Sequence, residues 1–418
     1  MNARIAASFD ARSGGCYNAP ASKHVYQETC PMPPSLDLSR YAFSGADATP
    51  IENLRALSVE DRNRLIHAGI DVDAAASSGA FMHLNHSGVH CQSRQDGLEI
   101  LHIKDALARY DGLPQYYWKL LDPDKDEFTC AAHANLHGGY FIRARKGVKI
   151  ADPVQSCLFI KGSGTGQNVH NIVVVEEGAE LNILGGCATA HGTRDVAHLG
   201  MTEYFVERGG KLSFTMIHNW GEDAAVRPRS IGVMGEDAVF LNNYILLKPV
   251  ANLQMYPAII LQGRRAVARF NSVMLAPPGS HVDSGNRIQL DAPDTRAEII
   301  SRTLTTGGTI INRGFIGASA VPARGHLECK GLILGQGRIH AIPELDAEVD
   351  GVELSHEAAV GKIAQEEIEY LMARGLDEDE ATAAIVRGFL NVDIMGLPPA
   401  LKTTIDEQLE VLHTKTAM

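Results

Sequence analysis

The sequence lacks any long run of apolar residues. No window of its 418 residues approaches the length of a transmembrane span, and the first ten residues lack the apolar core of a signal peptide. We therefore expect a cytoplasmic protein with no membrane partner.

Positive charge is also scarce. Lysine and arginine total 38 against 50 acidic residues, which gives a formal net charge of -12. Binding to a phosphate backbone or to anionic lipid needs a concentrated basic surface. This charge balance argues against nucleic acid as a partner.

The cysteines show no pairing pattern. Their number is odd, they lie far apart, and no CxxC pair occurs, which favours reduced thiols over a disulfide framework. The seven positions are Cys16, Cys30, Cys91, Cys130, Cys157, Cys187 and Cys329.

What the chain does contain is a globular composition, with 45% hydrophobic and 21% charged residues. The pattern of apolar, β-branched and glycine residues changes twice along the chain. This predicts three parts: a mixed, largely helical domain over 1–127, a β-rich core over 128–354, and a helical C-terminal domain over 355–418. In the first part we expect helices at 58–69, 103–110 and 113–121. Ser58 is suited to cap the first of these and Gly69 to end it.

The middle part carries an internal repeat of a turn followed by a short apolar strand. The spacings between successive turns are 31, 31, 28, 28 and 31 residues. A period near 30 predicts stacked coils, and a propeller blade would need about 40–50 residues. We therefore expect an all-β core, a parallel β-helix, with helical caps at both ends. The repeat begins at Gly147, Gly178, Gly209, Asp237, Arg265 and Arg296.

The C-terminal part contains clear helix signals. Gly375 is placed to end a helix over 365–373, and Asp377 with Glu380 forms a capping box for a helix over 378–390. A third helix is predicted after Leu397, with one apolar face. The face consists of Leu401, Ile405, Leu409 and Leu412. Packing against the β-helix and docking of a partner both fit this bundle.

Two blocks of sequence carry a family resemblance. One runs from Gly325-His-Leu-Glu-Cys329 through Ser355-His356-Glu357 to Arg374-Gly375. The other runs from Gly166 through Gly186-Cys187 and His198 to Ile217-His-Asn-Trp220. Their order resembles the SufB/SufD family of iron–sulfur cluster assembly proteins, and the second block follows the SufB side.

The resemblance implies a scaffold that receives iron and sulfur and builds an iron–sulfur cluster where two β-helices meet. Cys187 matches the cysteine that accepts sulfur, and His198 matches a histidine that moves protons or sulfur. Cys329, His356 and Glu357 match candidate ligands of iron and the cluster. Soft thiolate and imidazole suit iron. Phe159 and Lys161 replace polar residues of the family's sulfur path.

The same resemblance implies a set of partners. These are a SufC-type ABC ATPase docked on the C-terminal helices, a second copy of the chain or a SufD-like subunit, a cysteine desulfurase or other sulfur donor, and apoproteins that receive the cluster. The loop 162–166 lacks the Lys-Ser/Thr of a phosphate loop, so we expect the chain to have no ATPase activity of its own. The resemblance implies a scaffold rather than an enzyme, with ATP hydrolysis in the partner.

Plainer interpretations stand beside these. A lone cysteine in a β segment is usually core packing, which applies to Cys187. His356 and Glu357 fit the entry and first turn of a helix equally well. A SufD-like structural partner that holds no cluster is the main alternative function. A β-helix carbohydrate enzyme would need paired carboxylates in a groove, and nothing selects such a pair.

Histidines and cysteines also cluster in two sets, one in the N-terminal part and one at the start of the core. His83, His86 and His90 precede Cys91, and Cys130 precedes His133 and His137. Neither set follows a known zinc pattern, so we interpret them as solvated loop residues.

Overall fold

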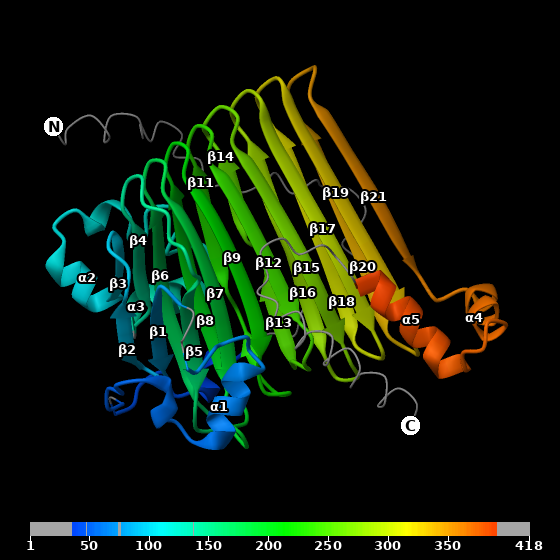
Figure 1. Ribbon diagram of the computed structural model, residues 1–418, viewed down its shortest axis with the longest axis horizontal. Helices are drawn as coiled ribbons and strands as arrows, with labels where there is room; N and C mark the ends of the chain where they lie inside the picture. Colours follow the sequence, from blue (N-terminus) through cyan, green and yellow to red (C-terminus); the bar gives the residue numbers. More distant parts are fainter. Residues whose placement is uncertain (1–35, 47, 74–76, 137, 391–418) are drawn as a thin grey trace. The chain divides into compact units, whose positions relative to one another are not determined.

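The computed structural model describes residues 36–46, 48–73, 77–136 and 138–390, all within one compact unit, Pro33–Met418. Parallel strands stack along this unit as a β-helix, with α2 and α3 near the first coils and α4 and α5 at the other end (Figure 1). The all-β core and the parallel β-helix predicted from the repeat are confirmed.

Two sheets face each other across the lumen. The first sheet has the order β2-β1-β5-β7-β9-β12-β15-β17-β19-β21. Its strands are β1 (Gly79–Leu84), β2 (Ser87–Ser93), β5 (Val154–Ile160), β7 (Glu180–Thr189), β9 (Lys211–Asn219), β12 (Val239–Leu246), β15 (Val267–Ala276), β17 (Thr295–Thr305), β19 (Ala323–Ile333) and β21 (Glu353–Gly361).

The second sheet has the order β10-β13-β16-β14-β11-β8-β6-β4-β3, and β18 joins β16 to β20. Its strands are β3 (Leu98–His102), β4 (Tyr140–Ala144), β6 (Gly166–Val175), β8 (Ala197–Val206), β10 (Ala225–Val226), β11 (Arg229–Met234), β13 (Asn252–Met255), β14 (Ala258–Leu261), β16 (His281–Leu290), β18 (Thr309–Ala318) and β20 (Arg338–Ala347).

The repeat positions are the sharp turns between the two sheets. Gly147, Gly178 and Gly209 have φ of 73°, 68° and 65°, and Asp237 and Arg265 have 57° and 61°. This left-handed conformation is free of steric cost for glycine only. Each of these residues donates its N–H to a carbonyl of the next coil, for example Gly147 to Glu177 at 2.9 Å.

The sixth turn departs from the expected repeat. Its left-handed residue is Asp294, with φ of 63°, two positions before Arg296. Arg296 already belongs to β17 and pairs with Val267 of the preceding coil.

Residues alternate between lumen and outer surface along each strand, as the pleat requires. In β19, Leu327 and Cys329 are buried in the central apolar cluster. His326 and Glu328, which alternate with them along the strand, point outward. The lumen cluster runs from the first coils to Cys329. Each coil is thus stabilised mainly by burial against its neighbours.

The N-terminal part contains more strand than the sequence suggested. β1, β2 and β3 lie within 79–102, and β1 pairs in parallel with β5 as an additional part-coil. The first expected helix is present as α1 (Val59–Ile66), where Ser58 Oγ accepts the N–H of Asp61 at 3.1 Å and Gly69 follows with φ of 79°.

The other helices of this part are shorter than expected or were not expected. They are η1 (Leu38–Arg40), η2 (Leu54–Ala56), α2 (Ile103–Arg109), η3 (Leu113–Gln115) and α3 (Glu127–Ala134). The expected helix over 113–121 is only the short η3. It ends because Trp118 has φ of 52° and because Leu120 donates its N–H to the Glu203 carboxylate at 2.5 Å instead of to a helical carbonyl.

The C-terminal part begins later than expected, because β21 continues to Gly361. α4 (Gln365–Met372) and α5 (Glu378–Leu390) follow, with Gly375 at φ of 103° between them. Asp377 and Glu380 form the capping box, with hydrogen bonds of 2.9 and 2.7 Å. The third helix predicted after Leu397 lies outside the described residues.

None of the helices in the described ranges is long and apolar enough to cross a membrane.

Candidate functional site

Cys187 lies on β7 and points into the lumen. It is 1% exposed, and its Sγ is 3.4 Å from the Sδ of Met216 on the next coil. Directly beside it in the ladder stands His218 of β9. Burial raises the pKa of the Cys187 thiol well above its usual value, so the group is a neutral thiol at physiological pH.

His198 reaches the same part of the lumen from β8 on the second sheet. Its ring lies 4.9 Å from that of Trp220, and Trp220 lies 5.5 Å from His218. His198 Nδ1 donates to Gln167 Oε1 at 3.0 Å. Because Gln167 uses its amide nitrogen on two backbone carbonyls, its oxygen must be the acceptor. Burial lowers the pKa of His198 to about 3.

The structure therefore brings Cys187 and His198 into one buried cluster with residues that the sequence did not single out. His218 Nδ1 and Tyr244 Oη share a hydrogen bond of 2.8 Å. A signal for His218 existed, since it follows Cys187 by one repeat and must occupy the same position on the next coil. Without the strand register, however, His218 could not be distinguished from a residue that only flanks the Asn-Trp motif.

Cys329 lies at the other end of the lumen, on β19. It is 1% exposed and stands between Ser301 of β17 and Ala358 of β21. Burial is the main cause that raises the pKa of its thiol to about 12, and the neighbouring Glu328 adds to it. The thiol is neutral until it is exposed or bound by a metal.

His356 and Glu357 belong to β21 rather than to a helix, so they point to opposite faces. His356 pairs with Leu327, which is fully buried in the lumen, and therefore lies on the inward face. It is nevertheless exposed, because β21 is the last strand of its sheet. Cys329 and His356 are diagonal neighbours on this face, with Cα atoms about 8 Å apart by strand geometry.

Glu357 is separated from this pair. It stands beside Glu328 on the outer face, and its Oε1 forms an ion pair of 3.1 Å with Lys330 Nζ. Lys330 also pairs with Glu328 at 3.1 Å, and Arg302 completes the network. The helix-entry interpretation of His356 and Glu357 is wrong, since both lie within a strand.

One inward row of the first sheet joins the two cysteines. Adjacent strands place Met216, Tyr244, Ser272, Ser301 and Cys329 at successive positions of the ladder. Two of the five are serines in a lumen that is otherwise mostly apolar, and Ser301 Oγ donates to Asn312 Oδ1 at 3.1 Å. The row starts at the residue that contacts Cys187 Sγ.

Phe159 and Lys161 do not line this row. Phe159 is buried on the outer face of β5, in the apolar cluster beneath α1. Lys161 Nζ forms an ion pair of 2.8 Å with Asp61 of α1. Neither side chain therefore lies in the inward row between the two cysteines.

The coil beyond Cys329 is open. Among the described residues, β21 pairs only with β19 and β20 only with β18, so each has a free backbone edge. Residues 355–361 of β21 are exposed. Free edges of this kind are templates for pairing with another chain.

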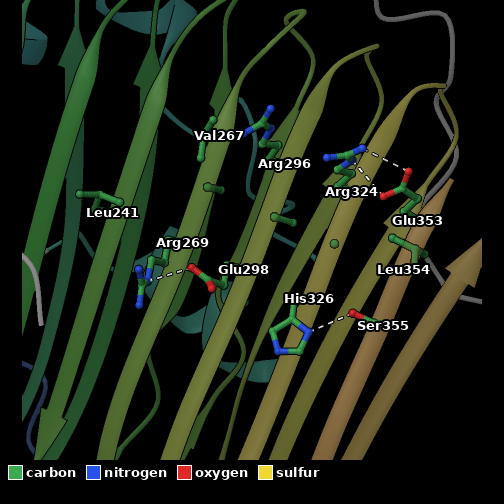
Figure 2. Close-up of a pocket in the computed structure, with 13 residues that line it drawn as sticks. Leu241, Val267, Arg269, Arg296, Glu298, Arg324, His326, Glu353, Leu354 and Ser355 are labelled. Atoms are coloured by element: carbon green, nitrogen blue, oxygen red, sulfur yellow. Dashed lines mark hydrogen bonds and ion pairs between the residues drawn. The ribbon is translucent and has the colours of Figure 1, made fainter. Parts of the chain in front are cut away.

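A groove of about 680 Å³ crosses the outer face of the first sheet near this end (Figure 2). Figure 2 shows Arg269 facing Glu298, Arg324 facing Glu353, and His326 bonded to Ser355 across the strands. No cysteine lines it, and neither does His356. The groove is therefore not the place where thiol and imidazole meet.

Among the described residues, the histidines near the N-terminal end do not gather into a group that could hold a metal ion. His83 is fully buried on β1, which corrects its interpretation as a solvated loop residue. Its ring lies 5.9 Å from that of His102. His137 is outside the described residues.

Comparison with known proteins identifies the family of this chain. The family model for the SUF system FeS cluster assembly SufBD core domain matches residues 158–389. An iron–sulfur cluster assembly SufBD family protein of Archaeoglobus fulgidus is 48% identical over 352 residues, 84% of this chain and 95% of that protein. A homologue from Methanothermobacter thermautotrophicus is 37% identical over 384 residues, 90% and 93% of the two chains.

A relative named SufB, from Bacillus subtilis, is 31% identical over 309 residues, 72% of this chain and 66% of that protein. The matched core spans the strands that carry Cys187, Cys329 and His356, and it reaches into α5. The chain belongs to the SufBD family of iron–sulfur cluster assembly proteins.

Proposed function

We propose that this chain is a scaffold on which an iron–sulfur cluster is built between two β-helices. The observation that carries the proposal is the inward pair Cys329 and His356 beside the free edge of β21. Protein-held clusters commonly take four ligands. One chain offers two soft donors on this face, and a two-fold partner would supply the same two again.

The cluster is cargo in this proposal, so weak ligation is an advantage. Cys329 binds iron as thiolate after losing the proton that burial favours, and His356 binds through a neutral imidazole nitrogen. In a single chain, Glu357 lies on the outer face, where it forms an ion pair with Lys330. We therefore assign it no more than an accessory role in binding the cluster. It reaches the cluster only around the edge of β21.

Sulfur is proposed to enter at Cys187, with His198 nearby to exchange protons. The inward row through Tyr244, Ser272 and Ser301 supports passage from Cys187 toward Cys329. Possession of both cysteines supports a SufB-like role over that of a SufD-like structural partner. The sulfur itself comes from a cysteine desulfurase or another persulfide donor, and apoproteins take the finished cluster.

Conformational work is proposed to come from a SufC-type ABC ATPase bound to α4 and α5. The pair offers exposed apolar side chains, with Tyr370 57% and Met372 41% exposed. Because β21 continues to Gly361, the informative truncation is after Gly361, which keeps His356 in place. We expect this truncation to abolish stimulation of the ATPase, and unchanged turnover would contradict docking on the helices.

The scaffold role is tested by anaerobic reconstitution with ferrous iron and sulfide, followed by visible and Mössbauer spectra. We expect cluster signals in the wild type and in Cys91→Ala, and their loss in Cys329→Ala and His356→Ala. Cys91 lies on β2, distant in the fold from Cys329, and serves as the control cysteine. Wild-type protein that never gains a cluster would instead support the SufD-like alternative.

A further inference from the structure

The lumen around Cys187 contains a second histidine besides His198, and its place in the ladder is closer. His218 of β9 is the direct neighbour of Cys187, on the same inward face, with Cα atoms about 5 Å apart by strand spacing. His218 is 5% exposed and Cys187 1%. Thiol and imidazole thus lie side by side on one sheet face, away from bulk water.

The other side of His218 is held in place. Tyr244 Oη lies 2.8 Å from His218 Nδ1, and the two rings meet edge to face at 5.0 Å. Trp220, the residue directly after the end of β9, lies against the ring, with 5.5 Å between the ring centroids. When Nδ1–H donates to Tyr244, the free lone pair of the imidazole is on Nε2, the nitrogen that remains for the thiol.

We propose that His218, positioned by Tyr244, takes the thiol proton of Cys187 when Cys187 accepts sulfur. This rests on the proposed function, in which Cys187 is the sulfur acceptor. The arrangement is that of a nucleophile, a base and an orienting group, assembled from β7, β9 and β12.

The step balances as a transfer of sulfane sulfur from a persulfide donor. As the Cys187 proton moves to Nε2, Sγ attacks the outer sulfur of the donor R–S–SH. The new S–S bond forms on Cys187, the donor S–S bond breaks, and its electron pair leaves on RS⁻. The imidazolium returns the proton to RS⁻, so the products are Cys187–S–SH and RSH with no net oxidation.

The electrostatics of the lumen explain why a neighbouring base is needed. Burial raises the pKa of Cys187 and lowers that of His218 to about 3, so both are neutral at rest. The titratable groups that act on the two are Tyr140, Cys157, His198 and Tyr244. None of the four is charged at neutral pH. A thiolate formed alone would be desolvated without compensation, whereas an ion pair with His218 offsets part of that cost.

The test is the rate at which glutathione persulfide modifies Cys187 in the full-length chain. Peptide mass spectrometry follows that one thiol between pH 6 and pH 9. For the wild type we expect a nearly flat profile, because the proton stays within the pair. For His218→Gln we expect a rate about 100-fold lower at pH 7 that rises tenfold per pH unit, since hydroxide must then remove the proton.

Tyr244→Phe provides a second variant that keeps the packing of the ring. We expect a rate several-fold lower than that of the wild type, because His218 then loses its orienting partner. Its dependence on pH should lie between the flat profile of the wild type and the steep profile of His218→Gln. His281→Gln on the outer face of β16 is the matched histidine control and should behave as wild type. Thermal unfolding of each variant shows that the fold is intact.

A His218→Gln profile identical in rate and slope to the wild type would overturn the inference. The result is independent of cluster assembly, because the persulfide readout uses no iron. Failed reconstitution with a His218-dependent profile would reject the scaffold alone. Normal reconstitution with an unaltered His218→Gln profile would reject the role of His218 alone.

Discussion

At the scale of single residues, the strand pleat decides which neighbours share chemistry. His356 and Glu357 are adjacent in sequence, yet one faces the lumen beside Cys329 and the other pairs with Lys330 outside. Cys187 and His218 are a full repeat apart, yet they are ladder neighbours. A sequence motif therefore groups His356 with Glu357, although they face opposite sides, and it does not reveal that Cys187 and His218 are neighbours.

The pleat makes a prediction for Glu357→Gln. The lost ion pair with Lys330 is solvent-exposed, so the free energy of unfolding should fall by less than about 1 kcal/mol. Because the side chain lies on the outer face, reconstituted cluster should remain well above the level of His356→Ala. Denaturant unfolding and iron content check the two parts. Equal loss of iron in both variants would make Glu357 a principal ligand.

At the scale of elements, the left-handed turns fix the length of each coil. Gly178 sits in such a turn with φ of 68°, and its N–H donates to the carbonyl of Arg208 in the next coil. Three turns use a residue other than glycine. One of them has Asp294, and two neighbouring coils have Asp237 and Arg265. Their side chains bond to each other at 2.6 Å, which helps offset the backbone cost.

Two glycine substitutions should therefore change stability in opposite directions. Gly178→Ala should lower the free energy of unfolding by about 1 kcal/mol, since open space surrounds the site and only the backbone is strained. Gly388→Ala, on the exposed side of α5 with equal space, should raise local helix stability by about 0.5–1 kcal/mol. Denaturant unfolding tests the first and hydrogen exchange in α5 the second. A neutral Gly178→Ala would show that the turn relaxes.

At the scale of the whole molecule, the open final coil is the feature that calls for a partner. β20 and β21 keep free edges within the described part of the chain, and the exposed inward face of β21 includes His356 and Val360. A β-helix buries each coil against the next, so the last coil is stable in water only when something covers it.

The open coil predicts how the chain associates. Wild-type protein should sediment as a dimer, and Val360→Asp should weaken the dimer by about 100-fold, because a carboxylate would be buried without a partner. Val59→Asp on α1 changes another exposed valine, far from β21, and should leave association unchanged. Sedimentation equilibrium distinguishes these cases. A monomeric wild type would point to a SufD-like subunit as the natural partner.

The sequence alone was enough to predict the coil architecture, because the repeat near 30 residues and its turn residues are local signals. It likewise determined α5, where Asp377 and Glu380 satisfy the first amides of the helix. Its motifs singled out Cys187, Cys329 and His356, whose roles stay predictions. These features depend on residues close together in the chain or on a fixed period.

Which side chains meet depends on how distant segments pair in the folded chain. Ladder register placed His218 beside Cys187, and pleat parity moved Glu357 away from Cys329. The extension of β21 to Gly361 was also hidden, since its exposed small and polar residues resemble a helix entry until β19 provides a strand to pair with. Pairing between distant segments sets these relations, and a shift of one residue would reverse every inward and outward assignment.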